Sequence, residues 1–406
     1  MKLIKTIIIV ALFLSLSTEI LGQESSTITV TNPTEMYLKD SFIEIDVKNL
    51  SESFSLFNVK EEIPYQIFSD NGKSKLGFVI DLLPGQKMEL NLSKQNPNVK
   101  KQFPPRTYAE LAMKPGNIHI DGKFRGNSFQ NVTKIKVPAI HKDHDALFKY
   151  EGPGWESEKV GYRFYLDWRN ATDIFGKKVN ELILNKVGVH DTVAKDDSYH
   201  QMQEWGMDIF KVGSTLGIGS IGIMSDGKVN MVSKTDSIYC EIFENGPIRS
   251  KIRTNYFGWL VGDKKFNLQA DLSITAGSRL TKTELLVDGN PDNIVTGLAK
   301  YKGTNFIKSH AEGEWKYIAL YGNQTLVNEN DKLGIALFYK SSAAISLSED
   351  QINHIVQLKP INGKIEYYFC AAWEQEPEGI KSETEFVNYI NQTLHLLNNP
   401  IKTQIK

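Results

Sequence analysis

The residues with the clearest chemical potential follow the turn Gly152-Pro153-Gly154, in a run rich in aromatic side chains. Aromatic residues favour β-strands, and successive side chains of a strand point to opposite faces. One face would carry Arg163, Tyr165, Asp167 and Arg169. The other would carry Tyr162, Phe164, Leu166 and Trp168, which we expect in the core. Arginines can hold a carboxylate or sulfate and tyrosine can move a proton, so the first face indicates a binding cleft rather than an ion-paired surface.

A second polar cluster begins at Asp197 and continues to Gly213. It contains Tyr199, His200, Trp205 and Lys211 without clear periodicity, which predicts a long loop. Loops held on a β scaffold often carry function. We therefore favour a chemical role for His200 over that of an ordinary surface histidine. The alternative for Trp205 is packing in the core.

Other candidates have simpler explanations of equal weight. Arg279 is either an anion clamp or half of a buried ion pair, and Trp373 beside Glu374 is either a sugar platform or interior packing. His141 and His144 lie among aspartates, but no third histidine or cysteine is near, which argues against a metal site. His144 could line the cleft instead.

The glycines 217, 219 and 222 match a dinucleotide fingerprint, but a strand and a turn follow them rather than a helix. We expect no organic cofactor, and a divalent metal stays open.

Composition sets the broad class. The chain has 406 residues with 47 basic and 48 acidic side chains, so a nucleic-acid partner is not expected. Residues 1–22 resemble a secretory signal peptide, with Lys2 and Lys5 before a short apolar stretch. We expect an exported protein, periplasmic in location, without a transmembrane segment in its mature form. The two cysteines, Cys240 and Cys370, lie in apolar runs and could be paired or free.

The expected fold is all-β. Residues 23–95 read as a small β-sandwich, and the proline-rich segment that ends at Pro105 marks the boundary. Residues 96–406 show strand-like runs separated by turns such as Asp226-Gly227, which predicts a large antiparallel two-sheet sandwich. A helix begins at the capping box Ser382-x-x-Glu385, continues through Phe386 and Ile390, and closes the domain.

Four motifs carry a family resemblance: Glu151-Gly-Pro-Gly-Trp155-Glu156, Tyr199-His200 with Trp205-Gly-Met-Asp208, Asn245-Gly-Pro-Ile-Arg249, and Ala276-Gly-Ser-Arg279. They resemble a secreted bacterial family, encoded in polysaccharide-utilisation loci, that includes the oligosaccharide dehydratase of ulvan breakdown. The resemblance implies a galactose-mutarotase-like β-supersandwich. It also implies a lyase that removes water from a non-reducing-end glucuronate or iduronate and leaves a 4,5-unsaturated uronate.

For that reaction our hypothesis assigns Arg163 to the uronate carboxylate, with Arg279 or Arg169 as helper, and His200 with Tyr165 as the acid/base pair. We expect the neighbouring arginine to lower the pKa of Tyr165. Further contacts to a uronate oligosaccharide, sulfated or not, would come from Trp155, Asp167, Arg169, Tyr199, Trp205, Lys211, Arg279, Trp373, Glu374 and His144. The alternatives are a polysaccharide lyase on uronate-containing glycans and a non-catalytic glycan-binding protein.

Overall fold

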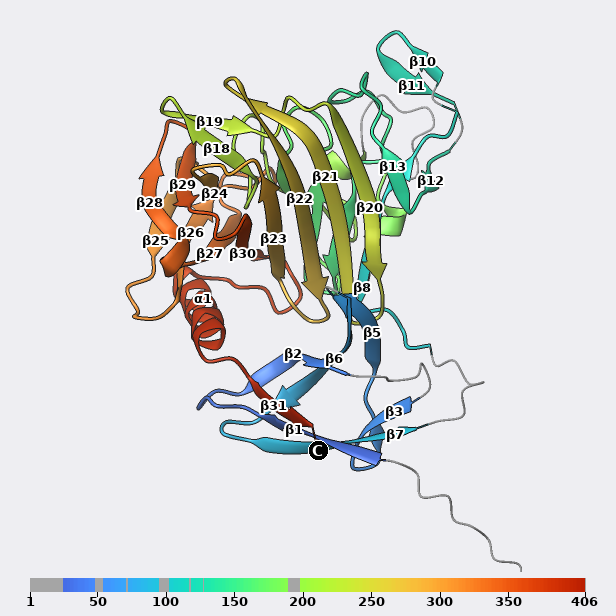
Figure 1. The fold of residues 1–406 in the computed structure, drawn as a ribbon, viewed down its shortest axis with the longest axis vertical. Helices are drawn as coiled ribbons and strands as arrows, with labels where there is room; N and C mark the ends of the chain where they lie inside the picture. The colour runs from blue at the N-terminus through green and yellow to red at the C-terminus, as the bar shows by residue number, and fades with distance from the viewer. Residues whose placement is uncertain are drawn as a thin grey trace, which may run out of the picture.

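A computed structural model describes residues 25–47, 54–70, 72–94, 102–116, 118–126, 128–188 and 198–405. The signal peptide expected over residues 1–22 lies outside them. Figure 1 shows a small β module below a much larger β domain. The all-β class is confirmed.

The small module consists of two sheets around their own apolar core. The five-stranded sheet has the order β31 (Lys402–Ile405), β1 (Ser25–Thr31), β7 (Lys87–Lys94), β3 (Phe54–Asn58) and β4 (Glu61–Glu62). The three-stranded sheet has the order β2 (Leu38–Asp46), β6 (Lys73–Leu82) and β5 (Tyr65–Asp70). Ile28, Leu56 and Phe78 are fully buried between them.

The end of the chain differs from the expected domain division. After the helix the chain returns to the small module, where β31 pairs antiparallel with β1. The module therefore takes strands from both ends of the chain, and the helix is not the last element.

The large domain contains three main sheets. The nine-stranded sheet has the order β13 (Lys134–Lys136), β20 (Ser237–Asn245), β21 (Arg249–Val261), β22 (Lys264–Thr275), β23 (Leu280–Asp288), β30 (Lys364–Trp373), β27 (Lys332–Lys340), β26 (Trp315–Asn323) and β25 (Thr304–Lys308). One five-stranded sheet has the order β17 (Gly206–Asp208), β16 (Thr172–Lys177), β15 (Gly161–Phe164), β14 (Gly154–Ser157) and β8 (Thr107–Glu110). The other has the order β19 (Lys228–Met231), β18 (Gly222–Ser225), β24 (Ile294–Ala299), β29 (Asn353–Leu358) and β28 (Ala344–Glu349).

Short elements complete the domain. They are the hairpin β10 (Ile118–Ile120) with β11 (Lys123–Arg125), the pair β9 (Ala112–Met113) with β12 (Gln130–Asn131), and the 3-10 turns η1 (Leu184–Lys186), η2 (Ser198–His200) and η3 (Ser341–Ala343).

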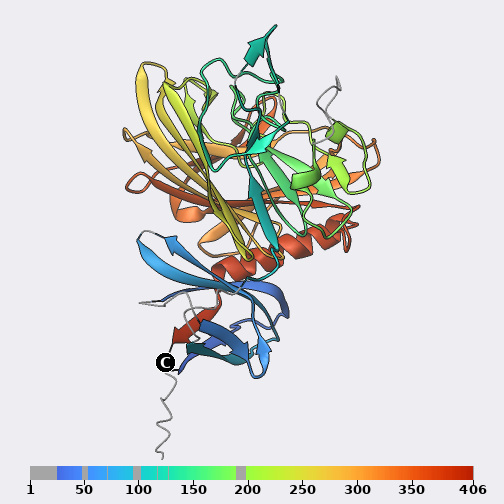
Figure 2. The same ribbon diagram turned by 90° about the vertical axis from the view of Figure 1, so that its right-hand side faces the viewer.

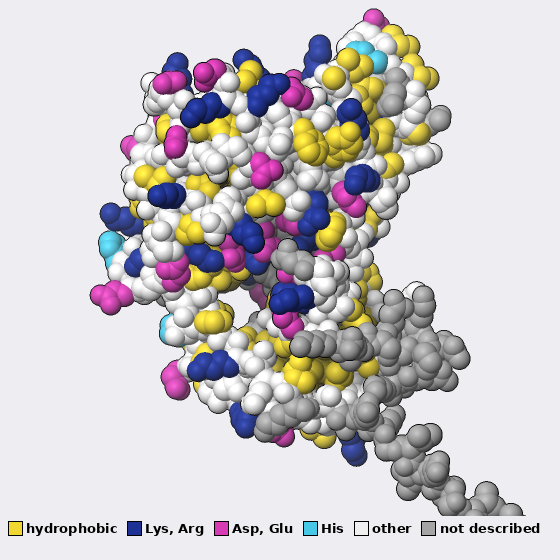
Figure 3. Space-filling model, viewed as in Figure 1, with side chains coloured by type: hydrophobic (Ala, Val, Ile, Leu, Met, Phe, Trp, Pro, Cys, Tyr) yellow, Lys and Arg dark blue, Asp and Glu magenta, His cyan; other side chains and the backbone are white. Residues whose placement is uncertain are grey.

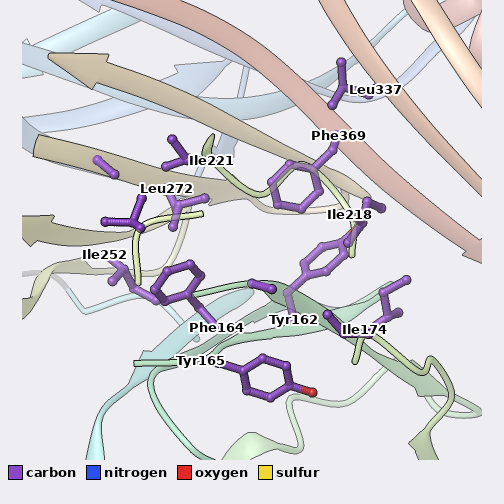
Figure 4. Close-up of a cluster of buried hydrophobic side chains, with 14 of the residues drawn as sticks. Tyr162, Phe164, Tyr165, Ile174, Ile218, Ile221, Ile252, Leu272, Leu337 and Phe369 are labelled. Atoms are coloured by element: carbon purple, nitrogen blue, oxygen red, sulfur yellow. The ribbon is translucent and has the colours of Figure 1, made fainter. Parts of the chain in front are cut away.

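The main core lies between the nine-stranded sheet and the two five-stranded sheets. Tyr162 and Phe164 of β15 share one buried cluster with Leu272 and Phe369 of the nine-stranded sheet. Figure 4 shows the rings of Tyr162 and Phe164 directed toward these residues, while the ring of Tyr165 lies on the other side of β15. The predicted alternation therefore holds from Tyr162 to Tyr165.

The alternation fails further along. Strand β15 ends at Phe164, and residues 167–169 form a turn in which the Asn170 amide donates to the Asp167 carbonyl. Trp168, expected in the core, lies on that turn and is 50% exposed. The prediction for Trp168 was wrong because a strand period was extended across a turn.

The single α-helix of the described residues, α1 (Glu383–Asn398), covers the outer face of the nine-stranded sheet. Ser382 caps it by accepting from the Glu385 amide at 3.2 Å, as the capping-box pattern predicts. Phe386, Ile390 and Leu394 are buried against β26 and β27. Figure 2 shows α1 running between the large domain and the small module.

The structure also bears on the predictions for a membrane-spanning helix and for the two cysteines. Within the described residues no helix has both the length and the apolar content to span a membrane. Cys240 and Cys370 are both free and buried.

The two leucines Leu56 and Leu83 of the small module allow a matched stability test. Leu56 is 0% exposed in the module core, whereas Leu83 is 59% exposed. We expect Leu56→Ala to lower the free energy of unfolding by about 2–5 kcal/mol, because it leaves a cavity. Leu83→Ala should change it by less than about 0.5 kcal/mol. Urea unfolding measures both, and equal effects would contradict the assigned core.

Candidate active site

A charged layer covers the outer face of the five-stranded sheet that contains β15. Arg163 of β15 lies directly opposite Asp173 of β16, and Phe175, two residues on, lies opposite Asp208 of β17. Because residues two apart in a strand share a face, Arg163, Asp173 and Asp208 all project from one side. The sheet register thus brings one guanidinium and two carboxylates together.

Arg163 is fully buried and bound by three carboxylates. Its Nη2 donates to Asp173 at 2.8 Å and to Asp208 at 2.5 Å, and its Nη1 reaches Glu151 at 3.5 Å. Burial alone would lower the pKa of Arg163, but Asp208, Tyr165 and Asp173 raise it well above its ordinary value. The guanidinium is permanently charged, buried, and engaged by carboxylates through all three of its nitrogens.

A second arginine extends this network toward solvent. Arg169 donates through Nε to Asp167 at 2.9 Å and through Nη2 to Glu151 at 2.6 Å. Burial would raise the pKa of Glu151, but the nearby charges of Arg163 and Arg169 outweigh it and lower that pKa. Glu151 is thus a bridging carboxylate between two guanidiniums.

Two histidines lie at the rim of this network. His200 places Nδ1 3.0 Å from Asp208 Oδ2, and its side chain is 41% exposed. His144 places Nδ1 3.3 Å from Glu151 Oε1, and its side chain is 61% exposed. The carboxylates that they contact bind Nη2 and Nη1 of the same guanidinium, that of Arg163. Both imidazoles are therefore oriented through Nδ1 by buried carboxylates while part of each side chain stays exposed.

Asp173 and Tyr165 form the inner part of the site. Burial raises the pKa of Asp173 to about 7, with a further increase from Asp208 that Arg163 does not offset. The Tyr165 hydroxyl donates to Asp173. Burial raises the pKa of Tyr165 well above its ordinary value despite the lowering effect of Arg163. The expected lowering of the Tyr165 pKa was wrong, because desolvation exceeds the effect of the arginine.

Aromatic rings cover the network. The Arg163 guanidinium carbon lies 5.1 Å from the Tyr199 ring centroid and 5.4 Å from that of Phe175. Tyr301 approaches from the loop after β24. Burial raises its pKa first, and the charges of Asp173 and Asp208 raise it further. These rings exclude water from the ion pairs and strengthen them.

Backbone strain accumulates in the same place. His144, Glu151 and Asn170 have φ angles of 55°, 73° and 43°, in the left-handed region that residues other than glycine rarely adopt. Such conformations persist only where the surroundings enforce them, and they are frequent at functional sites. Here the Glu151 carboxylate holds the loop of His144 by accepting from the His144 amide at 3.1 Å.

Of the residues predicted from the sequence, the structure brings together Arg163, Tyr165, His200, Asp167, Arg169, His144 and Tyr199. Two of their assigned roles need correction. Arg163 cannot be the substrate clamp, because three carboxylates already bind it. Tyr199 is buried and supports Arg163 and His200 with its ring rather than contacting a ligand.

Other predicted residues lie apart from this network. Trp155 and Trp373 are fully buried and donate to Thr281 and Asp331, so neither is a stacking platform. Glu374 accepts from the Lys332 amide, and Arg279 forms a buried ion pair with Glu376 at 2.6 Å. The ligand roles predicted for Trp155, Trp373 and Arg279 were wrong, because these side chains pack or pair in the interior, whereas that of Glu374 stays a prediction.

Trp205 is half-buried against Phe175, and Lys211 is exposed, with its carbonyl accepting from the Tyr301 hydroxyl. Both residues lie beside the network of Arg163 and its carboxylates.

Sequence reasoning missed the carboxylates that organise the site: Glu151, Asp173 and Asp208. A signal for Asp173 was available. A turn centred on Trp168 pairs Arg163 with Asp173 across a hairpin, as the structure shows. Glu151 lies in a loop, where no strand pairing predicts which residues face one another.

No group of three or more potential metal ligands was found among the described residues. The His141-x-x-His144 pair separates, with His141 Nδ1 bound to Asp145 at 2.8 Å and His144 turned to Glu151.

Comparison with known proteins places the chain in a family. Residues 30–403 match the family described as "Domain of unknown function (DUF4861)". The chain belongs to this family. It is also similar to "Uncharacterized protein P7" of Formosa agariphila, with 25% identity over 335 residues that cover 77% of this chain and 76% of that protein.

Among solved structures, the chain is similar to a protein of glycosyl hydrolase family 38 and to an α-mannosidase, both from Enterococcus faecalis. The TM-score is 0.43 for each, with identities of 7% and 8%, and 94% of this chain is covered. The chain spans about half the length of these proteins, 47% and 46%.

The role of Arg163 in stability can be measured directly. Arg163→Met should lower the free energy of unfolding by about 3–5 kcal/mol, because it leaves buried carboxylates without their counter-charge. Arg125, exposed on β11, provides the matched control, and Arg125→Met should have an effect below about 0.5 kcal/mol. Equal unfolding midpoints in urea for Arg163→Met and the wild type would refute this role.

Asp173 should make stability depend on pH. Its folded pKa of about 7 exceeds the ordinary value, so its contribution is fully present below about pH 4 and is lost as pH rises toward 7. The unfolding free energy of wild type minus that of Asp173→Asn should therefore fall over this range, by at most roughly 4 kcal/mol. Asp226→Asn, on an exposed turn, is the control. A difference that rises with pH would contradict the assignment.

Proposed function

We propose that this protein is a carbohydrate dehydratase. It would remove water from the non-reducing-end glucuronate or iduronate of ulvan-type oligosaccharides and leave a 4,5-unsaturated uronate. The observation that supports this most is the pair of exposed imidazoles, His144 and His200, each oriented by a carboxylate that binds the same buried arginine. Elimination of water needs one proton acceptor and one proton donor, and this pair can supply both.

The reaction would use the two histidines in opposite protonation states. The neutral imidazole takes the proton from C5 of the uronate, and the electron pair of the C5–H bond forms the C4–C5 double bond. The C4–O bond breaks, and the imidazolium gives its proton to the departing hydroxyl, which leaves as water. Proton exchange with solvent restores the starting states. Tyr165 is replaced by His144 in this scheme, because its buried hydroxyl is engaged by Asp173.

Charge balance is compatible with an anionic substrate only when part of the site is protonated. Glu151, Asp167, Asp173 and Asp208 face two guanidiniums, those of Arg163 and Arg169. The pKa of Asp173, raised to about 7, reduces the negative charge beneath the sugar at neutral pH. A protonated imidazole and the exposed Lys211 would supply the positive charge that stabilises the aci-carboxylate.

The proposal also covers the detailed fold and the cellular location of the protein. A dehydratase of this kind would have a galactose-mutarotase-like supersandwich and would act after export to the periplasm on products of polysaccharide-utilisation enzymes. The positive charges and apolar stretch within residues 1–22 support export.

The histidine pair gives the sharpest test. His144→Ala and His200→Ala should each lower kcat about 10²–10⁴-fold, because each removes one proton-transfer group. The assay follows the ultraviolet absorbance of the new double bond, formed from saturated oligosaccharides with a uronate at the non-reducing end.

His310→Ala is the control, because His310 is exposed beside β25 and remote in contacts from the network. Mass spectrometry of the wild-type products separates the rival reactions. A dehydratase leaves chain length unchanged and lowers the mass by one water, whereas a lyase produces two shorter chains. An unchanged sugar that binds would indicate a glycan-binding protein.

A further inference from the structure

A cavity of about 570 Å³ adjoins the candidate active site. It lies between β13, the loop before β20, the end of β21 and the turn that contains Asp167 and Trp168. The proton-transfer scheme of His144 and His200 does not use this cavity. Its volume is sufficient for one or two sugar rings, since ligand cavities of proteins begin at about 300 Å³.

Trp168 forms an aromatic wall of the cavity. Its side chain is 50% exposed, although tryptophan usually avoids water, and its neighbours Asp167 and Arg169 are buried. The turn is stabilised by the Asp167 carboxylate, which accepts from the Arg169 amide at 2.9 Å. The exposed indole offers a flat apolar surface, which suits the apolar face of a sugar ring.

Lysines give the cavity a positive charge. Lys136, Lys234 and Lys265 line it. Lys265 pairs with Asp236 at 2.8 Å, and Asp167 is held by Arg169. Across the described part of the chain, neither Lys136 nor Lys234 has an ion-pair partner. Two ammonium groups therefore remain available for an anion.

A buried nitrogen without a partner adds an independent sign of a ligand. His141 lines the cavity, and its side chain is 2% exposed. Its Nδ1 contacts Asp145, but its buried Nε2 has no hydrogen-bond partner among the described residues. Buried polar groups are nearly always satisfied, so this nitrogen is an unusual feature of the cavity wall.

The cavity is linked to His144 through a chain of ion pairs. Asp167 lines the cavity and binds Arg169, and Arg169 binds Glu151, which contacts His144. His141 and His144 also belong to one short loop. The cavity and the network therefore share the turn that contains Asp167.

We propose that this cavity is a subsite for a second, anionic sugar residue of the oligosaccharide. Trp168 stacks on the ring, and Lys136 and Lys234 bind its carboxylate or sulfate. The position of this sugar relative to the reacting uronate rests on the proposed function, but its binding does not. Recognition of an anionic neighbour would restrict the protein to charged glycans.

Binding is measured in the His200→Ala background, so that the sugar stays intact. Isothermal titration calorimetry with sulfated uronate oligosaccharides compares Trp168→Ala and the double variant Lys136→Ala/Lys234→Ala with that background. We expect each to raise Kd about tenfold or more. The double variant should also weaken the dependence of Kd on salt.

Matched controls are Phe306→Ala, an exposed aromatic residue in a separate cavity beside α1, and Lys60→Ala/Lys87→Ala, two exposed lysines of the small module. Both controls should leave Kd within twofold. Desulfated oligosaccharides identify the anion. An undiminished effect of the lysine variant assigns the carboxylate, whereas an effect confined to sulfated sugar assigns the sulfate.

Failure of this inference differs from failure of the proposed function. If wild-type protein leaves the sugar unchanged but Trp168→Ala weakens binding, the dehydratase assignment fails and the subsite stands. If the wild type dehydrates the sugar while Trp168→Ala and the lysine variant leave Kd and KM unchanged, the subsite is refuted. Absence of any binding of charged oligosaccharides also refutes it.

Discussion

The structure of the site depends on one buried guanidinium. Arg163 neutralises parts of three carboxylates that would otherwise repel one another in a water-free environment. Those carboxylates come from a loop, from strand β16 and from the edge strand β17. The arginine thereby joins segments that are distant in the chain and sets the positions of both exposed imidazoles.

A second buried ion pair lies on the same face of the sheet, beside the site. Lys177 and Glu156 are fully buried and lie 2.8 Å apart, and Glu156 also accepts from the amides of Ile183 and Leu184. Burial raises the pKa of Glu156 despite the nearby lysine. The outer face therefore carries buried ion pairs beside an apolar cluster that includes Phe175, Ile183 and Leu184, and both kinds of contact fix the loop on the sheet. The space-filling view in Figure 3 shows a different distribution on the molecular surface, where charges of both signs are interspersed.

The sequence predicts the fold class and helix well, because strand composition, turn residues and a capping box are local signals. The helix cap at Ser382 is confirmed, whereas the return of residues 402–405 to β1 depends on a contact across the whole chain. The convergence of Arg163, Tyr165 and His200 was anticipated from residue type. Burial could not be read from the same pattern, so Arg163 and Trp155 received ligand roles and Trp168 was assigned to the core.

The central claim is that the sugar reacts between His144 and His200, above the Arg163 network. The most direct measurement is a crystal structure of His200→Ala with a saturated oligosaccharide that ends in a uronate. We predict that C5 or the 4-hydroxyl of that uronate lies about 3–3.5 Å from His144 Nε2, as proton transfer requires. A sugar bound with its uronate remote from both histidines, for example in the cavity beside α1, would contradict the account.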